Sequence, residues 1–265
     1  YGSFLVQIRL CNRKIDRGGE YNRNTLVYDI EKRGMEAADV VVTVSNWTRN
    51  IVIEKYGIAP EKVITVHNAV DFKTDAVEKE ERGIKDKIVT FLGRITLQKG
   101  PEYFVEAAAK VLKRVPNARF VMAGSGEKMN PLVRRVAQLG LGTRFHFTGF
   151  LRGNDVQRMF RYSDVYVMPS VSEPFGISPL EAMRSGVPTI ISKQSGVAEV
   201  LDHAIKVDYW DIDALADAIY GVLTYPALSN HMQREGYNEV NELKWENASL
   251  KLKQIYQSIT QKEEL

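Results

Sequence analysis

The sequence predicts an α/β protein with a doubly wound, Rossmann-like parallel sheet, and two observations support this. Strand-like and helix-like segments alternate from about residue 23 onward, which is the pattern of consecutive βα units. The strand candidate at residues 39–44 is a nearly continuous apolar run, as expected for a strand buried on both faces of a parallel sheet. The 265 residues are enough for one large domain or two modest ones.

The first segments read as the end of one domain. A helix is expected over residues 23–38, a strand over 39–44, a helix over 46–56 and a strand over 63–67. Residues 68–86 contain the charged run Lys79–Arg82 and are interpreted as a domain boundary. The chain begins at Tyr1 within a segment that resembles a domain interior, so we expect an excised fragment with domains at 1–70 and 71–265.

The main βα series follows this connector. Pro101 at the first helical position, with Phe104, Ala108 and Val111 at helical spacing, predicts a helix over 101–115. The other expected elements are strands at 87–92, 119–123, 144–148, 165–168, 188–191 and 205–207, and helices at 130–139, 154–162, 179–185 and 197–200. Three helical stretches, 211–224, 227–243 and 246–262, complete the chain.

Composition narrows the function classes. The net charge of +3 is small, and lysine and arginine are spread along the chain, so nucleic acid is not an expected partner. The single cysteine, Cys11, excludes an internal disulfide framework and suits a reducing compartment. No apolar run reaches the roughly 18 residues that a membrane span needs.

The most informative segment lies between residues 165 and 188. A strand-like run is followed by Gly176 and by the helix-start pair Ser178-Pro179, and a strand that enters a helix through such a turn forms an anion site. Glu173 and Glu181 flank this site. Carboxylates do not bind phosphate directly but accept hydrogen bonds from hydroxyl groups. The segment therefore indicates a sugar next to a diphosphate.

This segment resembles the Glu-x7-Glu signature of retaining glycosyltransferases of family 4, which have the two-domain GT-B fold. Further segments resemble the same family in the same order, over roughly residues 30–260. They are Glu36–Asp39 with Val44-Ser45, Asn68–Asp71, Phe91–Arg94 with Lys99-Gly100, Ala123–Gly126 and Phe147–Phe150. The resemblance implies the donor-nucleotide domain of such an enzyme, preceded by the end of its acceptor domain.

The resemblance also implies roles for individual residues. Arg94 and Lys99 would stabilise the departing diphosphate, and Glu173 would lie near the donor sugar and the reacting face as a catalytic residue that is not a nucleophile. Glu181 would bind the ribose hydroxyls. The full set of expected donor-binding residues is Gly93, Arg94, Lys99, Gly124, Ser125, Gly126, Phe175, Gly176, Ile177 and Glu181.

Several of these residues have simpler interpretations that the sequence leaves open. Arg94 and Lys99 could be solvated loop charges, and Glu173 an exposed surface acid. The pattern Ser178-Pro-Leu-Glu181 is a capping box, with Ser178 as N-cap and Glu181 at the third helical position. Asp211-Ile-Asp213 resembles a metal-binding Asp-x-Asp motif, but its position at a helix start favours capping. We therefore expect no metal and no cofactor.

The resulting prediction is a hexosyltransferase that retains anomeric configuration. Its donor would be a UDP-, ADP- or GDP-linked sugar, and its acceptor a glycan, a lipid-linked hydroxyl or a small molecule. A cytoplasmic location is expected. Peripheral contact with the inner membrane, through the domain that this chain lacks, is compatible with it. The alternatives are a sugar-nucleotide epimerase of the same fold and a non-catalytic nucleotide-binding domain.

Overall fold

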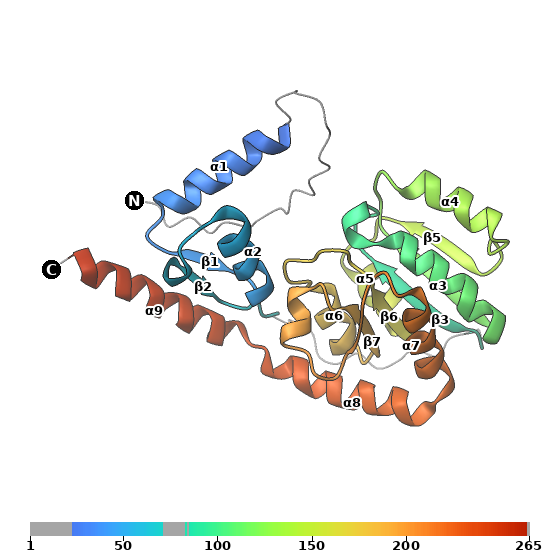
Figure 1. The fold of residues 1–265 in the computed structure, drawn as a ribbon. Coiled ribbons are helices and arrows are strands. Elements are labelled where there is room, and N and C mark those ends of the chain that lie inside the picture. The colour runs from blue at the N-terminus through green and yellow to red at the C-terminus, as the bar shows by residue number, and fades with distance from the viewer. Residues whose placement is uncertain (1–22, 71–82, 84, 264–265) are drawn as a thin grey trace. The chain divides into compact units, whose positions relative to one another are not determined.

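The computed structural model describes residues 23–70, 83 and 85–263, so the predicted connector run Lys79–Arg82 lies outside the described residues. The chain divides into two compact units (Figure 1). The first comprises Tyr1–Ala69 and Trp245–Leu265, and the second comprises Val70–Lys244. The sequence-based division assigned all of residues 71–265 to the second domain, whereas in the structure the last helix is part of the first unit.

The first unit contains a two-stranded parallel sheet with flanking helices. Its elements are α1 (Arg23–Ala37), β1 (Val41–Thr43), α2 (Asn46–Tyr56), β2 (Val63–Thr65) and α9 (Trp245–Glu263). Ser45 caps α2 by accepting a hydrogen bond from the Thr48 main-chain N–H at 3.0 Å. Helix α9 belongs here because its buried residues Ala248 and Ile255, one heptad apart on one helix face, pack against Val66.

The second unit is built on a six-stranded parallel sheet within the described residues, in the order β5-β4-β3-β6-β7-β8. The strands are β3 (Lys87–Leu92), β4 (Ala118–Ala123), β5 (Phe145–Gly149), β6 (Val165–Met168), β7 (Thr189–Ser192) and β8 (Ile205–Val207). The helices are α3 (Pro101–Arg114), α4 (Met129–Gln138), α5 (Asn154–Tyr162), α6 (Ser178–Arg184), α7 (Ile212–Thr224) and α8 (Pro226–Glu242). The predicted fold class is confirmed. Every predicted element is present within about two residues of its expected bounds, except that residues 196–199 form a 3₁₀-helix.

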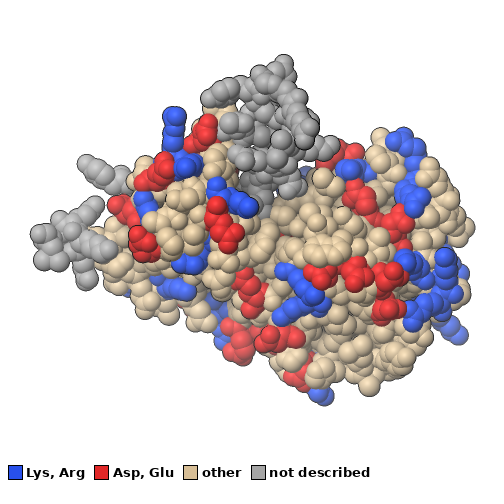
Figure 2. All heavy atoms as spheres, in the orientation of Figure 1, with Lys and Arg blue, Asp and Glu red and all other residues tan. Residues whose placement is uncertain are grey.

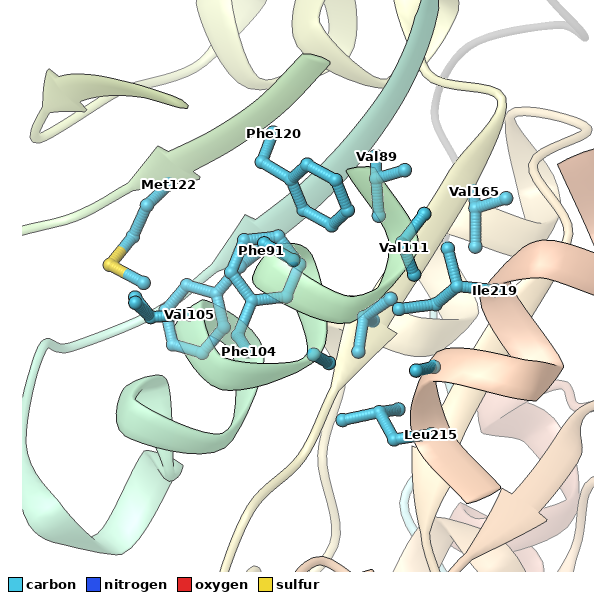
Figure 3. Packing of buried hydrophobic residues seen from close by; sticks show 14 of the residues in the cluster. Val89, Phe91, Phe104, Val105, Val111, Phe120, Met122, Val165, Leu215 and Ile219 are labelled. Carbon is cyan, nitrogen blue, oxygen red and sulfur yellow. The ribbon is translucent and has the colours of Figure 1, made fainter. Parts of the chain in front are cut away.

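The sheet is buried on both faces, and each face has its own packing partners. Toward α3 and α7, Phe104 forms the centre of an aromatic cluster, with ring centroids 5.7 Å from Phe91 and 5.4 Å from Phe120 (Figure 3). On the opposite face, Tyr166 of β6 packs edge-on against Phe160 of α5, with ring centroids 5.5 Å apart. The near-continuous apolar strands in the sequence follow from this two-sided burial.

Ion pairs cover the outer surface of α3 and α7. Lys110 pairs with Asp213 and Arg114 pairs with Asp217. On the face of the second unit that Figure 2 presents, acidic and basic side chains lie next to one another. Exposed pairs of this kind contribute little to stability.

Candidate functional site

The carboxyl edge of the second unit's sheet contains a topological switch point. From β3 the chain continues outward to β4 and β5, then returns to β6 on the other side of β3. In open α/β sheets, ligands bind in the crevice outside the carboxyl ends of the strands at such a point. Two loops meet here: residues 93–100 follow β3, and residues 169–177 follow β6.

An ion pair joins these two loops. Lys99 lies at the end of the 3₁₀-helix Leu97–Lys99, and its ammonium group donates a hydrogen bond to Oε2 of Glu173. Both side chains are largely buried, with exposed fractions of 19% for Lys99 and 11% for Glu173. Neither residue is therefore a solvated loop charge. Removing one partner would leave the other as a buried, uncompensated charge.

The main chain fixes both members of this pair. Gly100 has a φ of 62°, and a Cβ there would lie 2.1 Å from the carbonyl oxygen of Pro169, so only glycine lets the two loops approach. The Glu173 N–H donates to the Gln194 carbonyl at 3.1 Å, and the Glu173 carbonyl accepts from the Gly196 N–H at 2.9 Å. The carboxylate is thus held in place and is not the exposed surface acid that the sequence left open.

Arg94 stands at the solvent side of the same site. Its guanidinium is exposed, and Nη2 donates to Oε1 of Gln98 at 3.4 Å. Arg94 and Lys99 come from the same loop, so the structure places both predicted cations beside the switch point.

The glycines after β3 and β4 pack one loop against the other. A Cβ on Gly124 would lie 1.8 Å from the carbonyl oxygen of Gly93, and a Cβ on Gly126 would lie 2.3 Å from that of Ile95. The N–H of Gly93 donates to Ala123, and that of Gly124 donates to Gly149. These two N–H groups already have acceptors, which leaves loop packing as the main role of the glycines. Ser125 and Gly126 are exposed at the tip of this turn.

The turn that enters α6 contains two main-chain N–H groups without an acceptor among the described residues. Gly176 has a φ of 99°, which favours glycine, and Phe175 beside it is buried. In the part of the chain that the structure describes, the N–H groups of Gly176 and Ile177 have no acceptor. Helix α6 has seven residues. Its macrodipole is correspondingly small, so any anion binding at this turn depends mainly on the N–H groups themselves.

The capping-box alternative for Ser178 and Glu181 is not what the structure shows at α6. Ile177 is the N-cap residue and makes no side-chain capping bond, while the Ser178 hydroxyl instead bonds the Tyr166 hydroxyl at 2.7 Å. Tyr166 lies on the sheet face beneath α6. The Ser178 side chain bonds the Tyr166 hydroxyl and does not cap the N-terminus of the helix. Glu181 is therefore not required for capping.

Two carboxylates lie close to the buried Tyr166 hydroxyl. The pKa of Tyr166 is raised first by burial and further by the negative charges of Glu181 and Glu173, so the phenol stays neutral. Burial also raises the pKa of the Glu181 carboxyl, and no cation pairs with it among the described residues. Sequence reasoning missed Tyr166, because a tyrosine within an apolar strand has the same pattern as a core aromatic residue.

Unpartnered hydroxyl groups gather in the same two loops. The buried side-chain oxygens of Thr96, Ser170 and Ser172 have no hydrogen-bond partner among the described residues. Buried polar groups in native proteins are nearly always satisfied, by protein, water or ligand. All three lie in the two loops beside the switch point, where water or a ligand can complete their hydrogen bonds.

The Asp-x-Asp segment lies elsewhere and caps a helix. The Asp211 carboxylate accepts from the Ala214 N–H at 2.9 Å at the start of α7, and Asp213 pairs with Lys110. The capping interpretation of Asp211 is confirmed. No group of three or more His, Cys, Asp or Glu side chains within the described residues has a geometry that could hold a metal ion. Of the helices that the structure describes, none has the length and apolar character to cross a membrane.

The doubly wound sheet, with cations and carboxylates at its switch point, places the chain in the α/β class, whose ligands bind at that edge of the sheet. Comparison with known families makes the class specific. Residues 72–239 match the model described as glycosyl transferases group 1, and residues 12–74 match the one described as glycosyltransferase family 4. The first match covers more than half of the 265 residues, so the chain belongs to the glycosyl transferases group 1 family.

Relatives and solved structures agree with this assignment. A protein of Methanocaldococcus jannaschii that is named as a glycosyltransferase is 30% identical over 256 residues, covering 90% of this chain and 65% of the relative. The chain spans 50–65% of the length of the first curated relatives that it matches.

The solved structures share the fold. Sucrose-phosphate synthase from Thermosynechococcus elongatus superposes with a TM-score of 0.75 at 23% identity, over 92% of this chain and 64% of that protein. Anabaena HepE, solved with UDP and glucose, gives a TM-score of 0.73 at 17% identity, over 88% of this chain and 66% of that protein. At these identities the likeness shows the GT-B type of fold.

Proposed function

We propose that this chain supplies the donor site of a retaining glycosyltransferase, which moves a sugar from a nucleoside diphosphate sugar to a hydroxyl group of an acceptor. The observation that carries this proposal is the meeting of Lys99 and Glu173 across the switch point. One loop brings a cation for phosphate and the other brings a carboxylate for sugar hydroxyls, at the edge where α/β sheets bind ligands.

The cations and free N–H groups suit the leaving group. Negative charge grows on the departing diphosphate in the transition state, and fixed donors near it lower the barrier. Arg94 can bind the diphosphate with two parallel hydrogen bonds, and Lys99 adds a compact charge. Gly176 and Ile177 contribute the unpartnered N–H groups at the start of α6.

The two glutamates suit hydroxyl groups in different parts of the donor. Glu181 is partly buried, no described residue supplies a cation partner, and a carboxylate can accept hydrogen bonds from both ribose hydroxyls. Glu173 is assigned to the donor sugar near the reacting face. Its ion pair with Lys99 makes it a poor nucleophile. Retention would then follow from attack on the face that the leaving phosphate occupies, with a phosphate oxygen accepting the acceptor's proton.

The proposal includes binding without metal, because Arg94 and Lys99 supply positive charge where a metal ion would otherwise be needed. UDP is the first nucleotide to test, since it is the nucleotide named with the HepE structure, and ADP and GDP are the alternatives. The acceptor is a glycan, a lipid-linked hydroxyl or a small molecule. A cytoplasmic location, with peripheral contact to the inner membrane, is proposed with it.

Titration calorimetry with UDP, ADP and GDP in EDTA tests this function. We expect one of the three to bind without added metal. Loss of binding in EDTA that is restored by manganese would overturn the metal-free assignment. Incubation with the matching nucleotide sugar then separates the alternatives. Free or transferred sugar together with nucleoside diphosphate supports a transferase, an isomerised nucleotide sugar supports an epimerase, and unchanged donor supports a non-catalytic domain.

A further inference from the structure

Gln98 joins the two loops that form the candidate site through two hydrogen bonds and makes a third within its own loop. Its main-chain oxygen accepts from the Val171 N–H at 2.9 Å, and its side-chain Nε2 donates to the Ser172 carbonyl at 2.9 Å. On the other side of the amide, Oε1 accepts from Nη2 of Arg94 at 3.4 Å. A single residue therefore connects Arg94 to the segment immediately ahead of Glu173.

Only an amide of this length satisfies both side-chain contacts. The carboxamide presents an acceptor to the guanidinium of Arg94 and a donor to the Ser172 carbonyl, and these two ends cannot be exchanged without losing both bonds. A glutamate would turn an oxygen toward the carbonyl, and an apolar side chain would make neither bond. The acceptor end of the amide thus faces the donor Arg94, and its donor end faces the Ser172 carbonyl of the other loop.

The contact with Gln98 restricts the orientation of the Arg94 side chain. Arg94 is exposed, and a long arginine side chain loses rotamer freedom when it grips a ligand. A side chain that is already held in one orientation loses less of that freedom on binding, and so binds more tightly.

We infer that Gln98 is a positioning residue for donor binding. It orients Arg94 toward the diphosphate and sets the spacing between Arg94 and the loop that carries Glu173, without touching the donor. The inference rests on the proposed function, because it requires a nucleoside diphosphate at the switch point.

A double-mutant cycle tests this coupling. Gln98→Met keeps the side-chain length and the main-chain bond to Val171 but removes both polar side-chain contacts. We expect the affinity for UDP to fall about 3- to 10-fold, the range of one ordinary hydrogen bond, while uridine affinity changes less than about twofold. In an Arg94→Ala background, the effect of Gln98→Met on UDP should shrink below about twofold, since there is no guanidinium left to orient.

Two controls separate positioning from a general structural role. Gln138→Met makes the same exchange at an exposed position on α4 and should leave UDP affinity unchanged. Thermal unfolding of Gln98→Met without ligand reports any loss of stability. Gln98→Ala, which keeps the main-chain bond to Val171, replaces it if the methionine variant does not fold.

The outcomes distinguish this inference from the proposed function. Wild-type protein that binds none of UDP, ADP and GDP would overturn both. If the wild type binds UDP but Gln98→Met binds it equally well, only the role of Gln98 is wrong. An undiminished effect in the Arg94→Ala background, or an equal loss of UDP and uridine affinity, would make Gln98 a structural residue of the loop.

Discussion

The second unit has two regions of opposite character that are made by the same strands. Under α3 and α7, side chains of β3 and β6 such as Phe91 and Val165 are buried in a wholly apolar cluster (Figure 3). At the carboxyl ends of these strands, the loops bury Lys99, Glu173 and several hydroxyl groups, and Glu181 on α6 is half-buried. The apolar region gains free energy from its burial, whereas the polar edge loses free energy for each group that is not fully paired.

This difference indicates which region determines stability and which determines binding. Buried charges and hydroxyls without a partner among the described residues lower stability, and their concentration at one edge is consistent with the proposed binding site there. Substitutions under α3 should therefore change the free energy of unfolding and leave ligand affinity intact. Substitution of Arg94 or Glu181 at the edge should instead lower ligand affinity without lowering the free energy of unfolding.

The largest expected effect lies in the apolar region. Phe104 is fully buried and contacts the rings of Phe91, Phe120 and Phe145, so Phe104→Ala removes a large side chain and leaves a cavity. Urea unfolding should show a loss of about 3–5 kcal/mol. Val133→Ala, at an exposed position of α4, is the control and should stay within about 0.5 kcal/mol. A large fall in UDP affinity of folded Phe104→Ala would break the separation between the two regions.

Arg94→Ala should give the opposite pattern. The side chain is exposed and donates one long hydrogen bond to Gln98, so the free energy of unfolding should hardly change. Affinity for the nucleoside diphosphate should fall by about 1.5–3 kcal/mol, the range for a hydrogen bond to a charged group. Calorimetry with nucleoside as the comparison ligand checks this. Equal weakening of both ligands would mean that Arg94 does not contact phosphate.

Glu181→Gln combines a binding effect with a stability effect of opposite sign. Without the capping box, glutamine should lower affinity for the nucleoside diphosphate by about 1–3 kcal/mol, through loss of a charged acceptor facing the ribose hydroxyls. The 2′-deoxy nucleotide should bind wild-type protein weakly and be nearly insensitive to the substitution. Full affinity in Glu181→Gln would remove Glu181 from the ribose site.

The stability effect follows from the raised pKa of the Glu181 carboxyl. Between the ordinary value of 4.5 and the higher value in the folded state, the folded protein binds more protons than the unfolded chain. The free energy of unfolding therefore falls as pH rises through this window. Glu181→Gln lacks this penalty, so ligand-free urea unfolding should find it more stable than wild type at pH 7. The difference should vanish below about pH 4.5.

Sequence patterns predicted the fold, and they placed the candidate site at the loops after β3 and β6, because both depend on local signals. Apolar runs marked the buried strands, and Gly176 with Pro179 marked the start of α6. Lys99 and Glu173 were each assigned to the donor site, but their mutual ion pair joins residues 74 positions apart and has no signature in either segment.

The remaining details depend on tertiary contacts. Ser178 has the sequence pattern of an N-cap residue. In the structure its hydroxyl instead lies 2.7 Å from the Tyr166 hydroxyl and bonds it. Gln98 lies between two recognisable motif residues and has no pattern of its own, because its partners come from the opposite loop. Helix α9 follows the second unit in the sequence, yet its apolar face packs against Val66 of the first unit.

The smallest expected effect tests the start of α7, which lies over the apolar region and not at the polar edge. Asp211→Ala removes the hydrogen bond to the Ala214 N–H and should lower the free energy of unfolding by about 1 kcal/mol, the usual cost of losing an N-cap. Asp213→Ala removes only an exposed pair with Lys110, and the change should lie between about 0 and 1 kcal/mol.

Neither variant should alter UDP affinity, in EDTA or with manganese. A loss of manganese-dependent UDP binding in both variants would restore the Asp-x-Asp interpretation. Urea unfolding that ranks Asp213→Ala as the more damaging variant would contradict the capping role of Asp211.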